Sequence, residues 1–439
     1  MTRTQRWLTG IAIAVGVLVG GVIVAASVLL PSDEKIAAEL GARFEQNFGI
    51  GLKVGSSHRT LWPTPTLALN DLATAQPQPI TAKRVLLRLR VAPLWRREIA
   101  FDLVDIEGAV FPSASVRAFR GRGDAEKPEE FAKKHMPGEW GLASTPVEQL
   151  RWRNVTWIDR RDIPLAYDGE VTFDANWRPR MAAIRRPGVE PVTQARAERI
   201  GSNEDRWRVW MDVGGGTWNG EAKLDITTAG LMRVTGQFEA KAIDIESMVK
   251  AFDRRTPLAG KLSGMTDVDV QGNQVAEFAR QLHTRTKFSV KPAALTRIDL
   301  AKAVSTAGIS RGGRTPLDEF SGTLDTQGTD DGVILKYTNL KARSGVLTAT
   351  GNVRLFNRKI DGDATVDIVD GVVGVPLKVA GTVDAPEVSL TGAALTGAAI
   401  GTAVLPGVGT AIGARIGQQV ERMFGGKKEE KPKPRVGRP

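Results

Sequence analysis

The chain has 439 residues, 42% hydrophobic and 25% charged, which fits a folded protein of two domains or one elongated domain. It has no cysteine, which excludes disulfide scaffolds, Cys-ligated zinc, iron–sulfur clusters and thiol catalysis. The net charge of +11 is compatible with nucleic-acid binding as a function. However, the basic residues are interleaved with acidic ones, and no nucleic-acid-binding motif is present. We expect no nucleic-acid partner, because a basic surface facing anionic lipid, or simple solubility, explains the charge.

The first predicted element is an uncharged apolar segment, Trp7–Leu30. As a helix, its twenty-four residues span about 36 Å, which is enough to cross a hydrocarbon core of about 30 Å. Arg3 and Arg6 precede it, and Trp7 stands where an interfacial aromatic residue belongs. The positive-inside rule predicts a single-pass protein of a bacterial inner membrane, with a cytoplasmic N-terminus and the bulk of the chain in the periplasm. A cleaved signal peptide, ending near residues 25–27, is the less favoured alternative.

An amphipathic helix is predicted next, over residues 31–48. Its apolar side chains recur every four residues, as one stripe of a helix requires, and Gly49 ends it. The stripe consists of Ile36, Leu40, Phe44 and Phe48.

The hydrophobic period then falls to two, which indicates strands with one apolar face. Many glycines punctuate these runs, so we expect a mostly β protein. Such an apolar face needs cover, and helices are too scarce to supply it, so either the sheet folds on itself or an apolar ligand fills it. The clearest runs supply the candidate lipid-contacting residues Val85, Leu87, Leu89, Val91, Val375, Leu377 and Val379.

Few segments depart from this β pattern. Short helices are predicted at 244–252 and, more weakly, at 273–282. The charged segment 120–134 is predicted to be a loop or a small exposed helix, and 181–205 an irregular insertion. Tryptophans gather in the middle third, where they either line a groove, lie at a membrane interface or, as we favour, pack in the core. They are Trp140, Trp152, Trp157, Trp177, Trp207, Trp210 and Trp218.

A second uncharged stretch covers residues 390–414 and is rich in glycine and alanine. It suits either a membrane-contacting helical hairpin, since small residues let helices approach closely in lipid, or a flexible linker. The last residues, Lys427–Pro439, are basic and rich in proline, which predicts a disordered tail.

The order of several segments carries a resemblance to a known family. The predicted anchor is followed by LPSDEKIAAELGARFEQNFGIGLKV, LWPTPTLALNDLATA and ITAKRVLLRLRVAPLWRREIAFDLVDIEG. Farther on, PLAGKLSGMTDVDVQGN and TRIDLAKAV lead to VPLKVAGTVDAPEVSL, in which a Val-Pro-Leu strand, a Gly turn and a final Pro follow one another. In this layout, which covers about two-thirds of the chain, the protein resembles the AsmA family of envelope proteins, a bridge-like lipid-transfer group.

The resemblance implies an elongated, strongly curved antiparallel sheet that forms an open apolar groove. Family members are implicated in moving phospholipid from the inner to the outer membrane and in outer-membrane assembly. The expected partners are therefore phospholipid, the inner membrane and, as an open possibility, outer-membrane or envelope assembly proteins. The predicted regions are the anchor 1–30, an N-terminal AsmA-like β region 31–243, a C-terminal one 244–390, a glycine-rich segment 391–425 and a basic tail 426–439.

No enzyme is expected. Residues 308–312 match Gly-x-Ser-x-Gly, but a turn with Pro316 follows instead of the helix that a nucleophile elbow needs. The three histidines are far apart, and the Asp-Gly pairs at 331–332 and 361–362 are typical of hairpin turns, so neither a metal nor a cofactor is predicted. The leading hypothesis is a conduit that binds phospholipid; the alternative is a scaffold for outer-membrane protein assembly that offers a sheet edge and carries no lipid.

Overall fold

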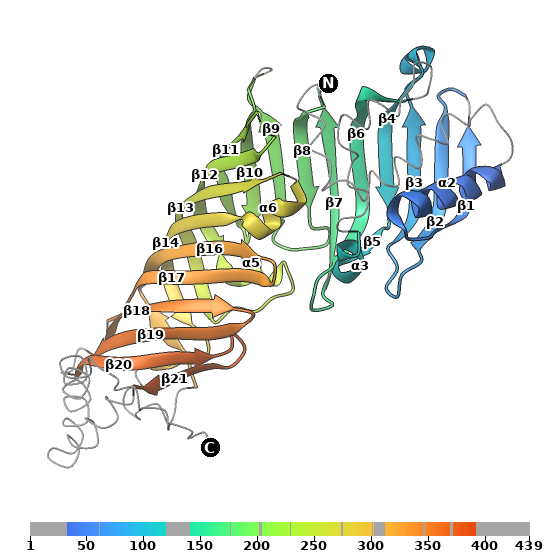
Figure 1. Ribbon diagram of the computed structural model, residues 1–439. Helices are drawn as coiled ribbons and strands as arrows, with labels where there is room; N and C mark the ends of the chain where they lie inside the picture. Colours follow the sequence, from blue (N-terminus) through green and yellow to red (C-terminus); the bar gives the residue numbers. More distant parts are fainter. Residues whose placement is uncertain are drawn as a thin grey trace, which may run out of the picture. The chain divides into compact units, whose positions relative to one another are not determined.

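The protein is mostly β, with 64% of the structure in strands and few helices (Figure 1). The computed structural model describes residues 33–60, 62–119, 141–175, 177–201, 204–228, 230–273, 275–300, 302, 312–345, 347–368 and 372–391. The predicted anchor with Arg3, Arg6 and Trp7 lies outside these residues, as do Trp140, Ser310, the segment 120–134 and the chain from residue 392 onward. Among the described residues, no helix is both long and apolar enough to cross a membrane.

The chain divides into two compact units. Unit 1 comprises Met1–Arg254, Met265–Thr284 and Gly328–Asp330, and unit 2 comprises Arg255–Gly264, Arg285–Gln327 and Asp331–Pro439. Strands β13 (Leu258–Gly272) and β14 (His283–Leu295) contribute residues to both units.

Unit 1 holds all the helices with described bounds and most of the strands. Its elements are α2 (Asp33–Phe48), β1 (Leu52–Thr60), β2 (Thr66–Thr74), β3 (Thr81–Leu89), η3 (Ala92–Arg96), β4 (Glu98–Glu107), β5 (Val110–Pro112), α3 (Ser113–Arg117), β6 (Gly141–Ile158), β7 (Pro164–Phe173), β8 (Pro179–Arg185), β9 (Gln194–Arg199), β10 (Arg206–Val213), β11 (Gly216–Ile226), β12 (Met232–Asp244), α5 (Ile245–Lys250) and α6 (Val275–Gln281).

The strands of unit 1 pair mostly with their neighbours in sequence. β1 to β4 form an antiparallel series, and β6 to β12 form a second one. The two series join through a parallel pair, β4 with β6, while the short β5 pairs with β3 and β6. The antiparallel expectation therefore holds within each series, and the β4–β6 junction departs from it.

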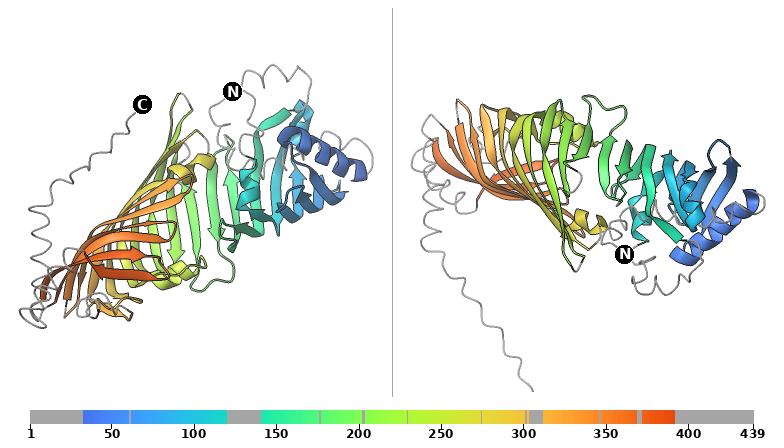
Figure 2. Two further views of the ribbon diagram at one scale, coloured as in Figure 1. Left: turned by 60° about the horizontal axis from the view of Figure 1, so that its bottom comes forward. Right: turned by 90° about the horizontal axis from the view of Figure 1, so that it is seen from above.

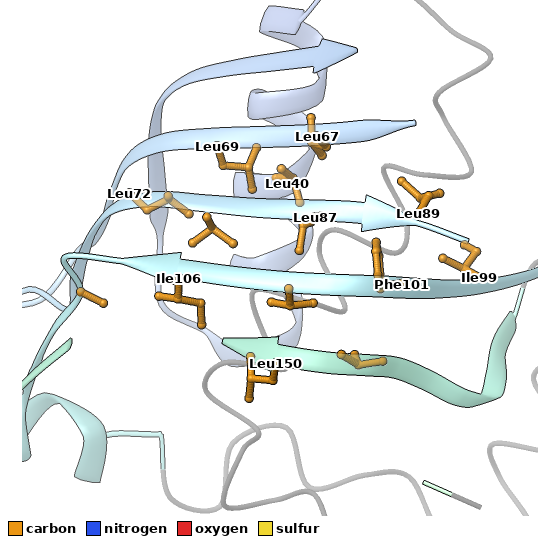
Figure 3. Packing of buried hydrophobic residues seen from close by; sticks show 14 of the residues in the cluster. Leu40, Leu67, Leu69, Leu72, Leu87, Leu89, Ile99, Phe101, Ile106 and Leu150 are labelled. Atoms are coloured by element: carbon orange, nitrogen blue, oxygen red, sulfur yellow. The ribbon is translucent and has the colours of Figure 1, made fainter. Parts of the chain in front are cut away.

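Helix α2 forms as its four-residue apolar period predicts, and it packs on the sheet of unit 1. Leu40 on its buried side joins the cluster that contains Leu67, Leu87 and Phe101 (Figure 3). Close approach depends on Gly41, because a Cβ there would lie 2.7 Å from the carbonyl oxygen of Leu52 in β1. One face of the first strands is thus covered by the chain's own helix.

Several local predictions are confirmed and three are corrected. The helices predicted at 244–252 and 273–282 appear as α5 and α6. The predicted irregular insertion 181–205 is wrong over much of its length, because β8 and β9 lie there and pair with each other and with β7 and β10. Val91 lies outside β3, directly before the η3 turn, where Pro93 ends the alternation. The pair 361–362 lies inside β19 (Lys359–Ile368) and forms no turn. The pair 331–332 does follow the expected pattern, because it lies at the turn between β16 (Glu319–Thr329) and β17 (Gly332–Arg343).

Unit 2 contains the last strands of the chain, which run side by side in sequence order (Figures 1 and 2). They are β15 (Thr315–Leu317), most of β16 (Glu319–Thr329), β17 (Gly332–Arg343), β18 (Leu347–Phe356), β19 (Lys359–Ile368), β20 (Val372–Gly381) and β21 (Pro386–Leu390). β17 to β21 form a continuous antiparallel meander in which each strand pairs with the next.

Candidate functional site

The strands β17 to β21 of unit 2 carry one continuous apolar face. In antiparallel strands, directly opposed residues lie on the same face of the sheet, and so does every second residue along each strand. The register opposes Leu335 to Leu355, Val366 to Val375 and Val379 to Val388, so the apolar positions of all five strands fall on the same side. This unit 2 apolar face consists of Val333, Leu335, Tyr337, Leu340, Ala342, Leu347, Ala349, Val353, Leu355, Ile360, Ala364, Val366, Val375, Leu377, Val379, Val388 and Leu390.

The opposite side of the same strands is mainly polar and charged, although Ile334 and Phe356 oppose each other on it. Lys336, Arg354 and Asp361 lie at the positions between the apolar ones, and Lys378 reaches Asp361 with its Nζ 2.6 Å from Oδ1. Hydrogen bonding to Lys378 lowers the pKa of the Asp361 carboxyl. The sheet therefore presents a solvated, ion-paired side and an apolar side.

Burial along the apolar face changes from one end of the strands to the other. At the end formed by Leu347, Val366 and Leu377, the side chains are fully buried. At the other end Leu335, Val353, Leu355, Ile360 and Val379 are only half-buried, and Val333 is 48% exposed. All the helices with described bounds belong to unit 1, whereas this half-exposed end belongs to unit 2.

An aromatic group adjoins this face within unit 2. The Phe288 ring lies 5.8 Å from the Phe320 ring and 6.3 Å from the Tyr337 ring, the latter edge-on. Burial raises the pKa of the Tyr337 hydroxyl. Tyr337 thus adds a large, mostly apolar side chain with a neutral polar tip to the face.

The candidate lipid-contacting residues separate into two groups. Val85, Leu87 and Leu89 lie together in unit 1, fully buried under α2 in the cluster of Figure 3, so the chain's own residues cover them. Val375, Leu377 and Val379 lie together on the unit 2 apolar face, where only Val379 is half-buried. Val91 joins neither group, because its side chain is exposed in the loop before η3.

The tryptophans of the middle third are mainly packed side chains. Trp177 and Trp207 are buried, and the Trp207 indole N–H donates to the carbonyl oxygen of Pro179. Trp157 is the most exposed of the described members of this set. Trp62 and Trp95, which were not among the predicted residues, are far more exposed. Both lie close to prolines in turns between strands, and this position is the sequence signal that predicts their exposure.

In the described part of the chain, no group of three or more His, Asp and Glu side chains is placed to hold a metal ion. The carboxyl groups with lowered pKa are engaged in structural contacts; the Asp269 carboxyl, for example, is held ionised by its hydrogen bond to Arg233. Comparison of the chain with protein-family models, curated proteins and solved structures gives no match.

Proposed function

We propose that the protein binds the acyl chains of phospholipid on the unit 2 apolar face. In this proposal it is a non-catalytic member of the AsmA family, anchored in the bacterial inner membrane with its bulk in the periplasm. It conducts phospholipid along an apolar β groove in support of outer-membrane biogenesis. The sequence resemblance and the mostly β fold support this proposal.

The observation that carries the proposal is the half-exposed end of the unit 2 apolar face. There Val333, Leu335, Leu355 and Ile360 keep part of their surface uncovered, while the other side of the same strands is mainly polar and charged. Partly exposed apolar side chains gathered on one surface mark a binding site for an apolar ligand or partner.

Acyl chains suit such a surface energetically. Each methylene removed from water contributes about 0.8 kcal/mol, so a diacyl lipid is held without directional bonds. Because the attraction is non-directional, a lipid can shift along the face without breaking hydrogen bonds, as conduction requires.

The test is lipid retention by the purified full-length protein, measured by extraction and mass spectrometry. Leu335→Glu places a carboxylate on the half-buried apolar face and is expected to reduce co-purified phospholipid at least threefold. Lys336→Glu is the matched control, because it adds the same group to the same strand on the charged side, opposite Arg354. It is expected to leave the bound lipid unchanged.

Two results would count against the proposal. Wild-type protein that carries no phospholipid would overturn it, and crosslinks to outer-membrane assembly proteins would then favour the lipid-free scaffold. Equal lipid loss in both variants would show that the apolar face does not hold the lipid.

A further inference from the structure

The last strand of unit 2 leads directly from the apolar face into the glycine-rich segment 391–425. Leu390 ends β21, pairs with Leu377 and is buried on that face. No charged residue then follows until Arg415. An uncharged segment of this length is driven to leave water, and the unit 2 apolar face is the surface to which it is joined.

The second half of the glycine-rich segment has the sequence pattern of an amphipathic helix. Its apolar side chains recur at spacings of four and three residues and define a stripe made of Ile412, Ile416, Val420 and Met423. Gln418 and Arg422 fall on the opposite side of the predicted helix. A helix with one apolar stripe needs an apolar surface on that side alone, whereas a helix that crosses a membrane is apolar all round.

Unit 1 shows how this chain covers an apolar face. Helix α2 directly precedes β1 in sequence, and its Leu40 packs in the same cluster as Leu87 of the sheet. The glycine-rich segment follows β21 as directly as α2 precedes β1. Packed on the last strands, it would form the second layer that an apolar sheet face needs.

The half-buried residues of the unit 2 apolar face lie close to the start of this segment. Val379 pairs with Val388, two residues before the end of β21, and Val353 follows two strands farther on, beyond Gly362. Three strand spacings separate β18 from β21, which is about 14 Å. A helix is about 10 Å across, so two helices joined at Pro406 are wide enough to cover these strands.

We propose that the glycine-rich segment 391–425 packs on the half-exposed end of the unit 2 apolar face when no lipid is bound there, with the stripe against the sheet. Phospholipid and the segment then compete for one surface, and this competition rests on the proposed lipid binding. The packing in lipid-free protein does not depend on that function. An apolar face that is covered when empty also exposes less surface for unspecific association.

The natural absence of cysteine allows a direct test on the full-length chain. Val353→Cys with Ile416→Cys places one thiol on the apolar face and one on the stripe, and a short bifunctional maleimide links them only when they lie close together. Arg354→Cys with Ile416→Cys is the matched control, because Arg354 is the next residue of β18 and lies on the opposite side of the sheet. The protein is stripped of lipid and held in amphipol, and mass spectrometry of the linked peptides gives the yield.

The yield with Val353→Cys is expected to exceed the yield with Arg354→Cys at least threefold. Adding Val420→Asp, which puts a charge on the stripe, is expected to lower the higher yield at least twofold. Gln418→Asp is the control on the other side of the predicted helix and is expected to leave it unchanged. Added phosphatidylethanolamine and phosphatidylglycerol are expected to lower it at least twofold, because lipid displaces the segment.

Equal yields with Val353→Cys and Arg354→Cys overturn the proposal, and they do so independently of lipid binding when the purified protein retains phospholipid. Linkage between two chains that carry one of the two cysteines each also overturns it, and assigns the face to a second copy. Absence of linkage, together with quenching of a fluorophore on Ile416→Cys by doxyl-labelled lipid in vesicles, overturns it and assigns the segment to the bilayer. Selective linkage that added lipid does not lower supports the packing but overturns the competition, and counts against the proposed lipid site.

Discussion

Arg199 and Asp174 form a buried ion pair, with Nη1 of the arginine 2.5 Å from Oδ2 of the carboxylate and the Arg199 side chain only 4% exposed. The same guanidinium reaches Asp205 at 3.1 Å and lies over the Trp207 ring. One side chain of β9 thus ties together the β7–β8 loop, the β9–β10 loop and β10.

Replacing Arg199 is expected to destabilise unit 1 strongly. Arg199→Ala leaves the carboxylates of Asp174 and Asp205 close together without this partner, and breaking a buried pair in this way costs about 3 kcal/mol. Chemical denaturation measures the free energy of unfolding. Arg196→Ala is the control on the same strand: its ion pair with Glu198 is exposed, so a change within about 0.5 kcal/mol is expected. Equal losses in both variants would contradict the buried pairing.

The docking of α2 is tested by Leu40→Ala. Leu40 is 2% exposed within the unit 1 cluster, so truncation leaves a cavity and should lower the free energy of unfolding by about 3 kcal/mol. Gln46→Ala, on the exposed side of the same helix, should change it by less than about 0.5 kcal/mol. If Leu40→Ala is tolerated equally well, α2 does not contribute to the core as described.

The hydrogen bond from Arg233 should hold the pKa of the Asp269 carboxyl below the ordinary aspartate value of 3.8. A depressed folded-state pKa adds stability above about pH 4, and that stability is lost as the pH falls through the folded-state pKa. Carboxyl NMR titration of the wild type and of Arg233→Gln measures the pKa of Asp269, and this pKa is expected to be higher in the variant. Lys378→Gln is the cross-check, since it should raise the midpoint of Asp361 and leave Asp269 unchanged.

The chain has only two tyrosines, and burial raises the pKa of both Tyr167 and Tyr337 above 10.0. The unfolded chain then ionises first, so the free energy of unfolding should fall as the pH rises above about 10. Tyrosinate absorbance of Tyr167→Phe isolates Tyr337, whose midpoint should lie above 10.0. Bound phospholipid should raise it further, because Tyr337 lies on the unit 2 apolar face. A midpoint at the ordinary value would place the hydroxyl in water.

Local periodicity was sufficient to predict much of the fold. The four-residue spacing of Leu40, Phe44 and Phe48 predicts α2, and the alternation from Val85 to Leu89 predicts β3. β8 has two adjacent alanines, and in β9 alanines alternate with charged residues, so both strands give a weak signal. Pairing between the two strands decides their structure.

Burial was less predictable, because it depends on what lies over a face. Leu87 and Leu355 belong to equally apolar strand patterns, yet Leu87 is buried under α2 whereas Leu355 is half-buried in unit 2. Alternation reports only that a face is apolar, and the covering element comes from a distant part of the sequence. The parallel β4–β6 junction was also beyond sequence reasoning, since no local pattern encodes it.

From β17 to β21, each strand pairs with the next one in sequence. The number of strands in this part of unit 2 can therefore change without altering the order of the others. A hairpin inserted between two of these strands would meet the same kind of ladder on each side, as a repeat does in a solenoid. It would widen the apolar face by about 10 Å without altering the register elsewhere. Duplication of single hairpins therefore offers evolution a gradual way to change the span of such a sheet.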